Sequence, residues 1–92
     1  MRAVGTFLIE GYWPQATVES LSLATNRLDE SLDRLRSGGP VLRTVAVTLV
    51  PQDEAAYWIV RAPTAEIVAA ACAQAGLTVE RIVEAIELPT RS

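Results

Sequence analysis

The chain has 92 residues, of which 50% are hydrophobic and 21% charged, and its formal net charge is −3. This length suits one domain, and so apolar a composition argues against disorder. The sequence has no histidine, no lysine and one cysteine, Cys72, which excludes an imidazole base, a Schiff-base lysine, an intramolecular disulfide and a cysteine-cluster metal site.

The first half of the chain predicts a strand, a helix and a second strand. Residues 4–13 are rich in β-formers, and Pro14 ends that strand. Thr17 is the expected helix N-cap, and apolar residues follow at the three- and four-residue spacing of an amphipathic helix: Leu21, Ala24, Leu28, Leu32 and Leu35. The Ser-Gly-Gly-Pro segment at 37–40 ends this helix, and the valine-rich residues 41–50 predict the second strand.

The second half predicts a hairpin partner, a helix and a closing strand. Residues 51–54 form a short turn before the strand 55–61, so these two strands are antiparallel. Thr64 is the expected N-cap of a helix whose inward stripe runs from Ile67 to Ala75, with Gly76 as its left-handed C-cap. Residues 81–88 form the last strand. The order β-α-β-β-α-β predicts an α+β, ferredoxin-like fold with one four-stranded antiparallel sheet and two helices.

Alternation along the strands divides their residues into two faces. The set expected beneath the helices is almost entirely apolar: Phe7, Ile9, Val45, Val47, Leu49, Tyr57, Ile59, Val83 and Ala85. The opposite set is mixed: Leu8, Glu10, Tyr12, Leu42, Thr44, Ala46, Thr48, Trp58, Val60, Ile82, Glu84 and Ile86. Two helices cannot cover both faces, and an open face rich in Leu, Val, Ile and Trp is unusual. We therefore predict a homodimer in which two sheets face each other.

Two carboxylates of the mixed set, Glu10 and Glu84, lie on strands that are neighbours in this topology. Pointing together into a partly closed interior, they would crowd like charges, and the pKa of at least one would rise. Such a pair can bind a cation, hold a ligand hydroxyl or act as general acid and base. The alternative is that both lie at the rim, solvated or paired with Arg43, Arg61 or Arg81.

Four of the five aromatic residues, Tyr12, Trp13, Tyr57 and Trp58, fall at a strand end and in the hairpin. They either wall a pocket for a flat organic ligand or fill the core and the interface. The ligand site predicted from the mixed face comprises Glu10, Tyr12, Thr44, Thr48, Trp58 and Glu84. Cys72 lies on the apolar stripe of the second helix and is expected to be an inert small hydrophobic residue.

Three segments resemble a family of small ferredoxin-like proteins, common in actinobacteria, that carry a domain of unknown function typified by a nickel-binding protein. They are residues 7–14 (FLIEGYWP), 50–54 (VPQDE) and 75–84 (AGLTVERIVE). The resemblance implies a dimeric α+β barrel. A glutamate at the position of Glu10 recurs in the family's opening motif, so the resemblance also favours Glu10 as a pocket residue, without giving it a role. The family's nickel ligands are histidines, which this chain lacks, so the resemblance does not carry nickel binding with it.

The sequence predicts a single domain over residues 1–92, with 90–92 as a loose tail. The negative charge argues against a nucleic-acid partner, and the apolar run 67–73 is far below the ~20 residues that span a bilayer, so a cytoplasmic location is expected. The leading hypothesis is a homodimer that binds a small organic molecule without a tightly bound cofactor. The alternatives are a cofactor-independent isomerase, cyclase or monooxygenase in which Glu10 or Glu84 transfers a proton, and a carboxylate-only metal binder.

Overall fold

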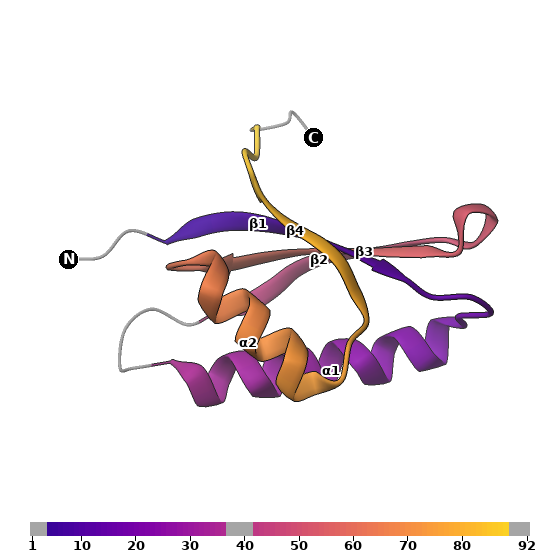
Figure 1. The fold of residues 1–92 in the computed structure, drawn as a ribbon, viewed down its shortest axis with the longest axis horizontal. Coiled ribbons are helices and arrows are strands. Elements are labelled where there is room, and N and C mark those ends of the chain that lie inside the picture. Colours follow the sequence, from indigo (N-terminus) through magenta and orange to yellow (C-terminus); the bar gives the residue numbers. More distant parts are fainter. Residues whose placement is uncertain (1–3, 37–41, 89–92) are drawn as a thin grey trace.

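A computed structural model describes residues 4–36 and 42–88 (Figure 1). Its elements are, in chain order, β1 (Gly5–Tyr12), α1 (Val18–Leu35), β2 (Arg43–Val50), a 3-10 turn η1 (Pro51–Asp53), β3 (Ala55–Ala62), α2 (Ala65–Ala75) and β4 (Val79–Ala85). The four strands form one antiparallel sheet in the order β2-β3-β1-β4. Both helices pack on the same side of the sheet (Figure 1). The predicted α+β, ferredoxin-like fold is confirmed.

The helix ends form where the side chains provide caps. Thr17 accepts a hydrogen bond from the Ser20 amide at 3.0 Å, and the Ser20 hydroxyl accepts one from the Thr17 amide at 2.9 Å, which closes a capping box. Thr64 caps α2 by accepting a single hydrogen bond from the Ile67 amide at 3.2 Å, without the reciprocal bond of a capping box. Gly76 ends α2 with a φ of 75°, in the left-handed region that favours glycine. The predicted caps at Thr17, Thr64 and Gly76 are confirmed.

The strand register corrects the predicted faces of β3 and β4. Trp58 and Val60 are buried under the helices, whereas Tyr57 and Ile59 lie on the open face, the reverse of the expectation. On β4, Ile82 and Glu84 share the helix-covered side with Ile9 and Phe7, so Val83 and Ala85 lie on the open face. On β3 the reason is that nearly every position is apolar, so its alternation gives no indication of which side is buried. On β4 the alternation is weak, and Glu84 lies exposed on the helix-covered side of this edge strand, so its polarity pointed to the wrong face.

A β-bulge changes the phase of β2 between Thr44 and Ala46. Val47 and Leu49 pair with Trp58 and Ala56 and so lie on the helix-covered side as predicted, but Thr44, opposite Val60, lies there too. Val45 falls within the bulge and is exposed.

Several element boundaries differ by a few residues from the prediction. The last strand begins at Val79 and ends at Ala85, earlier than the expected 81–88, and the turn 51–54 is a 3-10 turn followed by Glu54 in the left-handed conformation. The predicted helix terminator at 37–40, the start of the second strand at residue 41, the strand end at Pro89 and the tail 90–92 lie outside the described residues. No helix of the described residues is long and apolar enough to cross a membrane.

Candidate functional site

Trp58 on β3 organises the space between the sheet and the helices. Its side chain is only 1% exposed, and its indole Nε1 donates a hydrogen bond to the Thr25 hydroxyl of α1 at 3.0 Å. The Thr25 hydroxyl in turn donates to the Leu21 carbonyl at 2.8 Å. The other edge of the ring lies over Gly11 of β1, where a Cβ atom would come within 3.1 Å of the indole. One large buried residue therefore links β3, β1 and α1.

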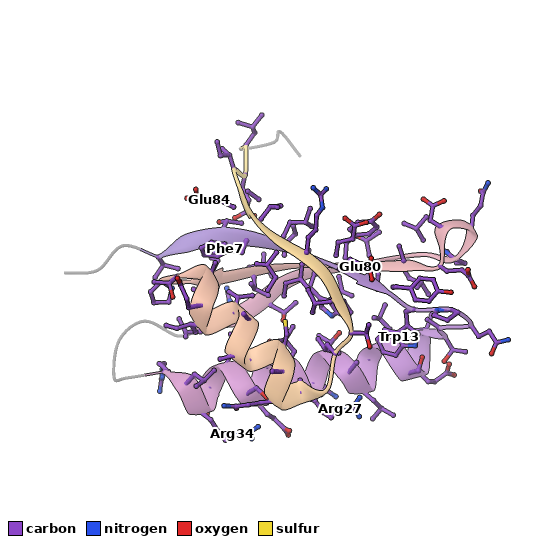
Figure 2. The ribbon with its side chains drawn as sticks, in the orientation of Figure 1. Phe7, Trp13, Arg27, Arg34, Glu80 and Glu84 are labelled. Atoms are coloured by element: carbon purple, nitrogen blue, oxygen red, sulfur yellow. The ribbon has the colours of Figure 1, made fainter. Side chains whose placement is uncertain are left out.

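A cavity of about 400 Å³ has Trp58 among its lining residues. We call it the aromatic pocket, and its lining residues are Tyr12, Trp13, Pro14, Arg27, Trp58, Gly76, Leu77 and Thr78. They come from the end of β1, from α1, from β3 and from the connection between α2 and β4. In Figure 2, Trp13 lies between the sheet and α1, the helix that carries Arg27. The volume falls within the usual range of small-molecule sites.

Two hydrogen bonds to backbone carbonyls and one contact between aromatic rings hold the walls of the aromatic pocket in place. The Trp13 amide donates to the Glu54 carbonyl at 2.7 Å, which fixes the chain leaving β1 against the β2–β3 turn. The Trp13 and Trp58 rings lie 6.2 Å apart with planes inclined by 32°. Arg27 Nε donates to the Ala75 carbonyl at 3.3 Å, at the C-terminal end of α2, where a cation is favoured by the helix dipole. Contacts within the chain therefore position the two rings and the guanidinium.

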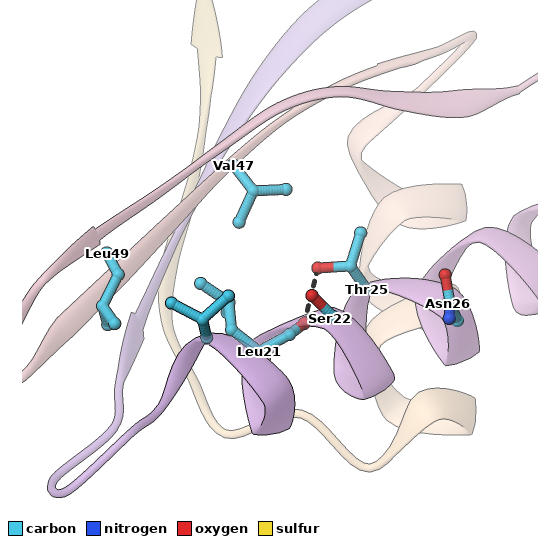
Figure 3. Close-up of a pocket in the computed structure, with 7 residues that line it drawn as sticks. Leu21, Ser22, Thr25, Asn26, Val47 and Leu49 are labelled. Atoms are coloured by element: carbon cyan, nitrogen blue, oxygen red, sulfur yellow. Dashed lines mark hydrogen bonds between the residues drawn. The ribbon is translucent and has the colours of Figure 1, made fainter.

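A second, more open cavity of about 390 Å³ lies between the N-terminal half of α1 and β2 (Figure 3). We call it the helix–strand groove, and it is lined by Val18, Leu21, Ser22, Thr25, Asn26, Val47 and Leu49. None of these residues is charged. Thr25 lines the groove and accepts the indole hydrogen bond of Trp58, which lines the aromatic pocket, so the two cavities lie on either side of this contact.

The two predicted site carboxylates lie apart. Glu10 is on the open face opposite Arg81, whose Nε lies 2.8 Å from the Glu10 Oε1, so it forms the ion pair that was the alternative expectation. Glu84 pairs in register with Phe7 on the other face and is exposed. Figure 2 places Glu84 and Trp13 at opposite ends of the sheet. The crowded carboxylate pair that the sequence suggested therefore does not form.

Of the six predicted ligand-site residues, Tyr12 and Trp58 line the aromatic pocket. Thr48 faces the open side opposite Tyr57. Thr44 lies on the helix side, where its amide donates to Asp29 Oδ1 at 2.8 Å, while its hydroxyl makes no hydrogen bond within the described part of the chain. Glu10, Thr44, Thr48 and Glu84 line neither cavity.

The described ranges contain one thiol, Cys72, and their acidic side chains are scattered. Cys72 is buried on α2, and burial raises the pKa of its thiol to about 11, which keeps it protonated near neutral pH. Within residues 4–36 and 42–88, no three acidic or cysteine side chains gather closely enough to hold a metal ion.

Sequence reasoning missed Arg27 and the segment Gly76–Thr78 as pocket residues. Arg27 precedes the buried Leu28 on α1, so it sits at the border of the apolar stripe and was grouped with the solvated positions. Gly76 ends α2, so the residues after it turn back toward the sheet. This C-cap was the one feature of the sequence that could have indicated a place for Gly76–Thr78 near the sheet. Their proximity to Arg27 depends on how α1 packs against α2, and no local sequence pattern encodes that packing.

Comparison with known proteins gives one match, in structure. No family model matches the chain, and no curated protein matches it. A solved structure, the crystal structure of SCO4226 from Streptomyces coelicolor A3(2), superposes with a TM-score of 0.69 at 18% identity, covering 95% of this chain and 99% of that one. The neighbour is an actinobacterial protein with the same small α+β fold, and at this identity the likeness concerns the fold alone.

Proposed function

We propose that the protein is a cytoplasmic homodimer that binds a small organic molecule in the aromatic pocket, without a tightly bound cofactor. The observation that carries the proposal is the cavity of about 400 Å³ in which both tryptophans of the chain meet Tyr12 and Arg27. Arg27 and Tyr12 are exposed side chains at the edge of this cavity, so the site is open to solvent. A concave surface with apolar and aromatic walls and a few placed polar groups is typical of small-molecule sites. The pocket lies on the helix side of the sheet, so a partner on the open face would leave it accessible.

The homodimer is proposed on the character of the open face. Apolar residues on the two central strands and on the edge strand β4 are only partly covered there: Leu8, Tyr57, Ile59, Val83 and Ala85. Ion pairs lie toward two of its ends, Glu10 with Arg81 at 2.8 Å and Arg61 with Glu87 at 2.9 Å. An apolar centre with a charged rim is the usual anatomy of a protein interface.

The C-terminal part of the described chain extends this apolar surface. Ile86 and Leu88 are 87% and 77% exposed, and the segment that carries them rises on the side of the sheet opposite the helices (Figure 1). Glu87, between them, accepts hydrogen bonds from Arg61 and from the Thr6 hydroxyl, both on the open face. A second copy is the occupant that matches this face, because the same apolar centre and mixed-sign rim are self-complementary about a two-fold axis.

Native mass spectrometry of the protein purified from its own host tests both parts of the proposal. The expected result is a dimer carrying an additional organic mass, which is lost in Trp13→Ala and retained in Leu23→Ala. Leu23 is exposed on α1 and lines neither cavity, so its variant controls for handling and fold. A monomer at micromolar concentration would contradict the dimer, and an adduct that survives Trp13→Ala would contradict the pocket.

No specific observation favours the enzymatic or the metal-binding alternative. The acid–base mechanism required Glu10 or Glu84 beside the ligand, but neither lines a cavity. Glu10 is already engaged by Arg81.

A further inference from the structure

We propose that the ligand of the aromatic pocket is a flat aromatic anion, such as an aryl carboxylate, held by Arg27. This inference rests on the proposed function and specifies the chemical class of its ligand. Arg27 is the one charged residue among those that line the pocket, and no acidic side chain stands among them. A cavity whose single charge is positive selects for an anion.

The guanidinium of Arg27 is held in position by one of its nitrogens. Nε donates to the Ala75 carbonyl at 3.3 Å, and neither terminal nitrogen hydrogen-bonds to another residue of the described ranges. These two nitrogens carry donors in the planar fork that matches a carboxylate. The contact with Ala75 therefore fixes the side chain and leaves its ligand-binding edge available.

The remaining walls favour a flat ring. Trp13 packs against Trp58 with ring centroids 6.2 Å apart and planes inclined by 32°. Because Trp58 is only 1% exposed, the ring surface open to a ligand is that of the half-buried Trp13, which Trp58 supports from behind. Tyr12 and Pro14, both exposed, add apolar surface beside it. Gly11 does not line the pocket, but by omitting a side chain it lets the Thr78 carbonyl and the Trp58 ring approach β1 closely. A planar aromatic body gains stacking and edge contacts here that a branched aliphatic one does not.

The helix–strand groove provides an internal contrast. It has nearly the same volume, about 390 Å³, but its lining includes no charged residue. A neutral ligand has no electrostatic reason to prefer the aromatic pocket over the groove, whereas an anion does. The charge of the ligand therefore distinguishes the two cavities.

The test compares 2-naphthoate with its neutral isostere 2-naphthamide by isothermal titration calorimetry on the full chain at pH 7.5. Trp13 lines the aromatic pocket only, whereas the Trp58 indole N–H donates to Thr25 of the groove, so a shift of the Trp13 indole N–H resonance reports in parallel that the probe binds in the pocket. The expected result is that wild type binds naphthoate at least about tenfold more tightly than naphthamide, as one charge-assisted hydrogen-bonded pair allows. Arg27→Met, which keeps the alkyl stem, should abolish that preference.

Arg34→Met is the matched control. Arg34 lies two turns along the same helix, hydrogen-bonds to Ser31 and lines neither cavity, so its removal lowers the net charge equally without touching the pocket. Arg27→Lys retains the charge and should keep part of the preference for naphthoate. This variant also provides the comparison if Arg27→Met does not fold. Equal binding of the two probes, or a preference that persists in Arg27→Met, overturns the ligand class and leaves the pocket standing. Failure of both probes to bind wild type overturns this inference, whereas the proposed function has its own test in the mass of the co-purified ligand and the effect of Trp13→Ala on it.

Discussion

The Trp58 indole and the Thr25 hydroxyl, 3.0 Å apart, form the polar contact that joins β3 to α1 inside the core. Trp58 is almost fully buried, so its N–H has no access to water, and Thr25 supplies the acceptor. The same hydroxyl donates its own proton in a hydrogen bond to the Leu21 carbonyl. A tryptophan is tolerated at this depth because its one polar atom has a partner.

Replacement of Thr25 by valine removes that acceptor at nearly constant volume. We expect the free energy of unfolding to fall by about 1–3 kcal/mol, the cost of a buried donor left unpaired. Urea denaturation measures the loss. Thr25→Ser keeps the hydroxyl and should lie much closer to wild type. If serine and valine destabilise equally, the hydrogen bond is not the cause.

Gly11 is required by the close approach of two neighbours. A Cβ there would come within 3.0 Å of the Thr78 carbonyl and 3.1 Å of the Trp58 ring. We expect Gly11→Ala to destabilise by roughly 1–3 kcal/mol through overpacking, and to weaken binding in the aromatic pocket, which Trp58 and Thr78 line. Thermal unfolding and titration of 2-naphthoate check the two effects.

Gly5 is the matched control in the same strand. Its nearest neighbour to an added Cβ is the Phe7 ring at 3.4 Å, an ordinary contact. Gly5→Ala should therefore leave stability unchanged or raise it slightly, because alanine loses less chain entropy on folding. Equal destabilisation by the two substitutions would contradict the steric explanation.

Most of the fold was predictable because its signals are local. Thr17, Thr64 and Gly76 are capping residues whose chemistry acts within one helical turn, and each occupies its predicted position. The faces of β3 were not predictable, because Tyr57, Trp58, Ile59 and Val60 are all apolar and only tertiary packing selects which two are buried. Burial of Trp58 depends on Thr25, more than thirty residues away in the chain.

The candidate site was predictable only in its aromatic part. Tyr12 and Trp58 were identified because aromatic residues gather at the end of the first strand and in the hairpin, and both line the pocket. The pairing of Glu10 with Glu84 failed because it required β1 and β4 to share a phase, whereas the register sets Glu10 opposite Arg81. Arg27 reaches the pocket through the packing of α1 on α2, a non-local contact.

Cys72 should react slowly with thiol reagents in the native protein. Burial raises its pKa from 9.0 to about 11, so the thiolate fraction at pH 8 falls from about one in ten to about one in a thousand. We expect labelling by iodoacetamide at pH 8 to be at least about 100-fold slower in native protein than in urea.

The same shift predicts a pH dependence of stability. The unfolded chain releases the Cys72 proton near pH 9 while the folded chain retains it to about 11, so the folded state binds more protons in that window and the free energy of unfolding decreases as pH rises through it. Cys72→Ala lacks this contribution and serves as control. In the iodoacetamide experiment, a labelling rate in native protein as fast as in the unfolded chain would contradict a buried, protonated Cys72 thiol.

Ile59 lies at the centre of the open face, between the β1 and β2 strands that flank β3. A lysine there would place an unpaired charge in the proposed subunit interface, whereas in a monomer it would meet water. We expect Ile59→Lys to raise the dimer dissociation constant by roughly 100-fold or more, the scale of a central hot-spot residue. Analytical ultracentrifugation over a concentration series measures it, and circular dichroism verifies that the variant is folded.

Leu23→Lys is the control for this substitution, because Leu23 is 61% exposed on α1, on the other side of the sheet. It adds the same charge at a surface position and should leave the dissociation constant unchanged. In a dimer, the melting temperature of wild type should also rise with protein concentration, and this rise should disappear in Ile59→Lys. If Ile59→Lys associates as tightly as wild type, the subunits do not join through the open face. If Leu23→Lys alone dissociates them, the interface lies on the helix side, and the aromatic pocket would then border the partner rather than solvent.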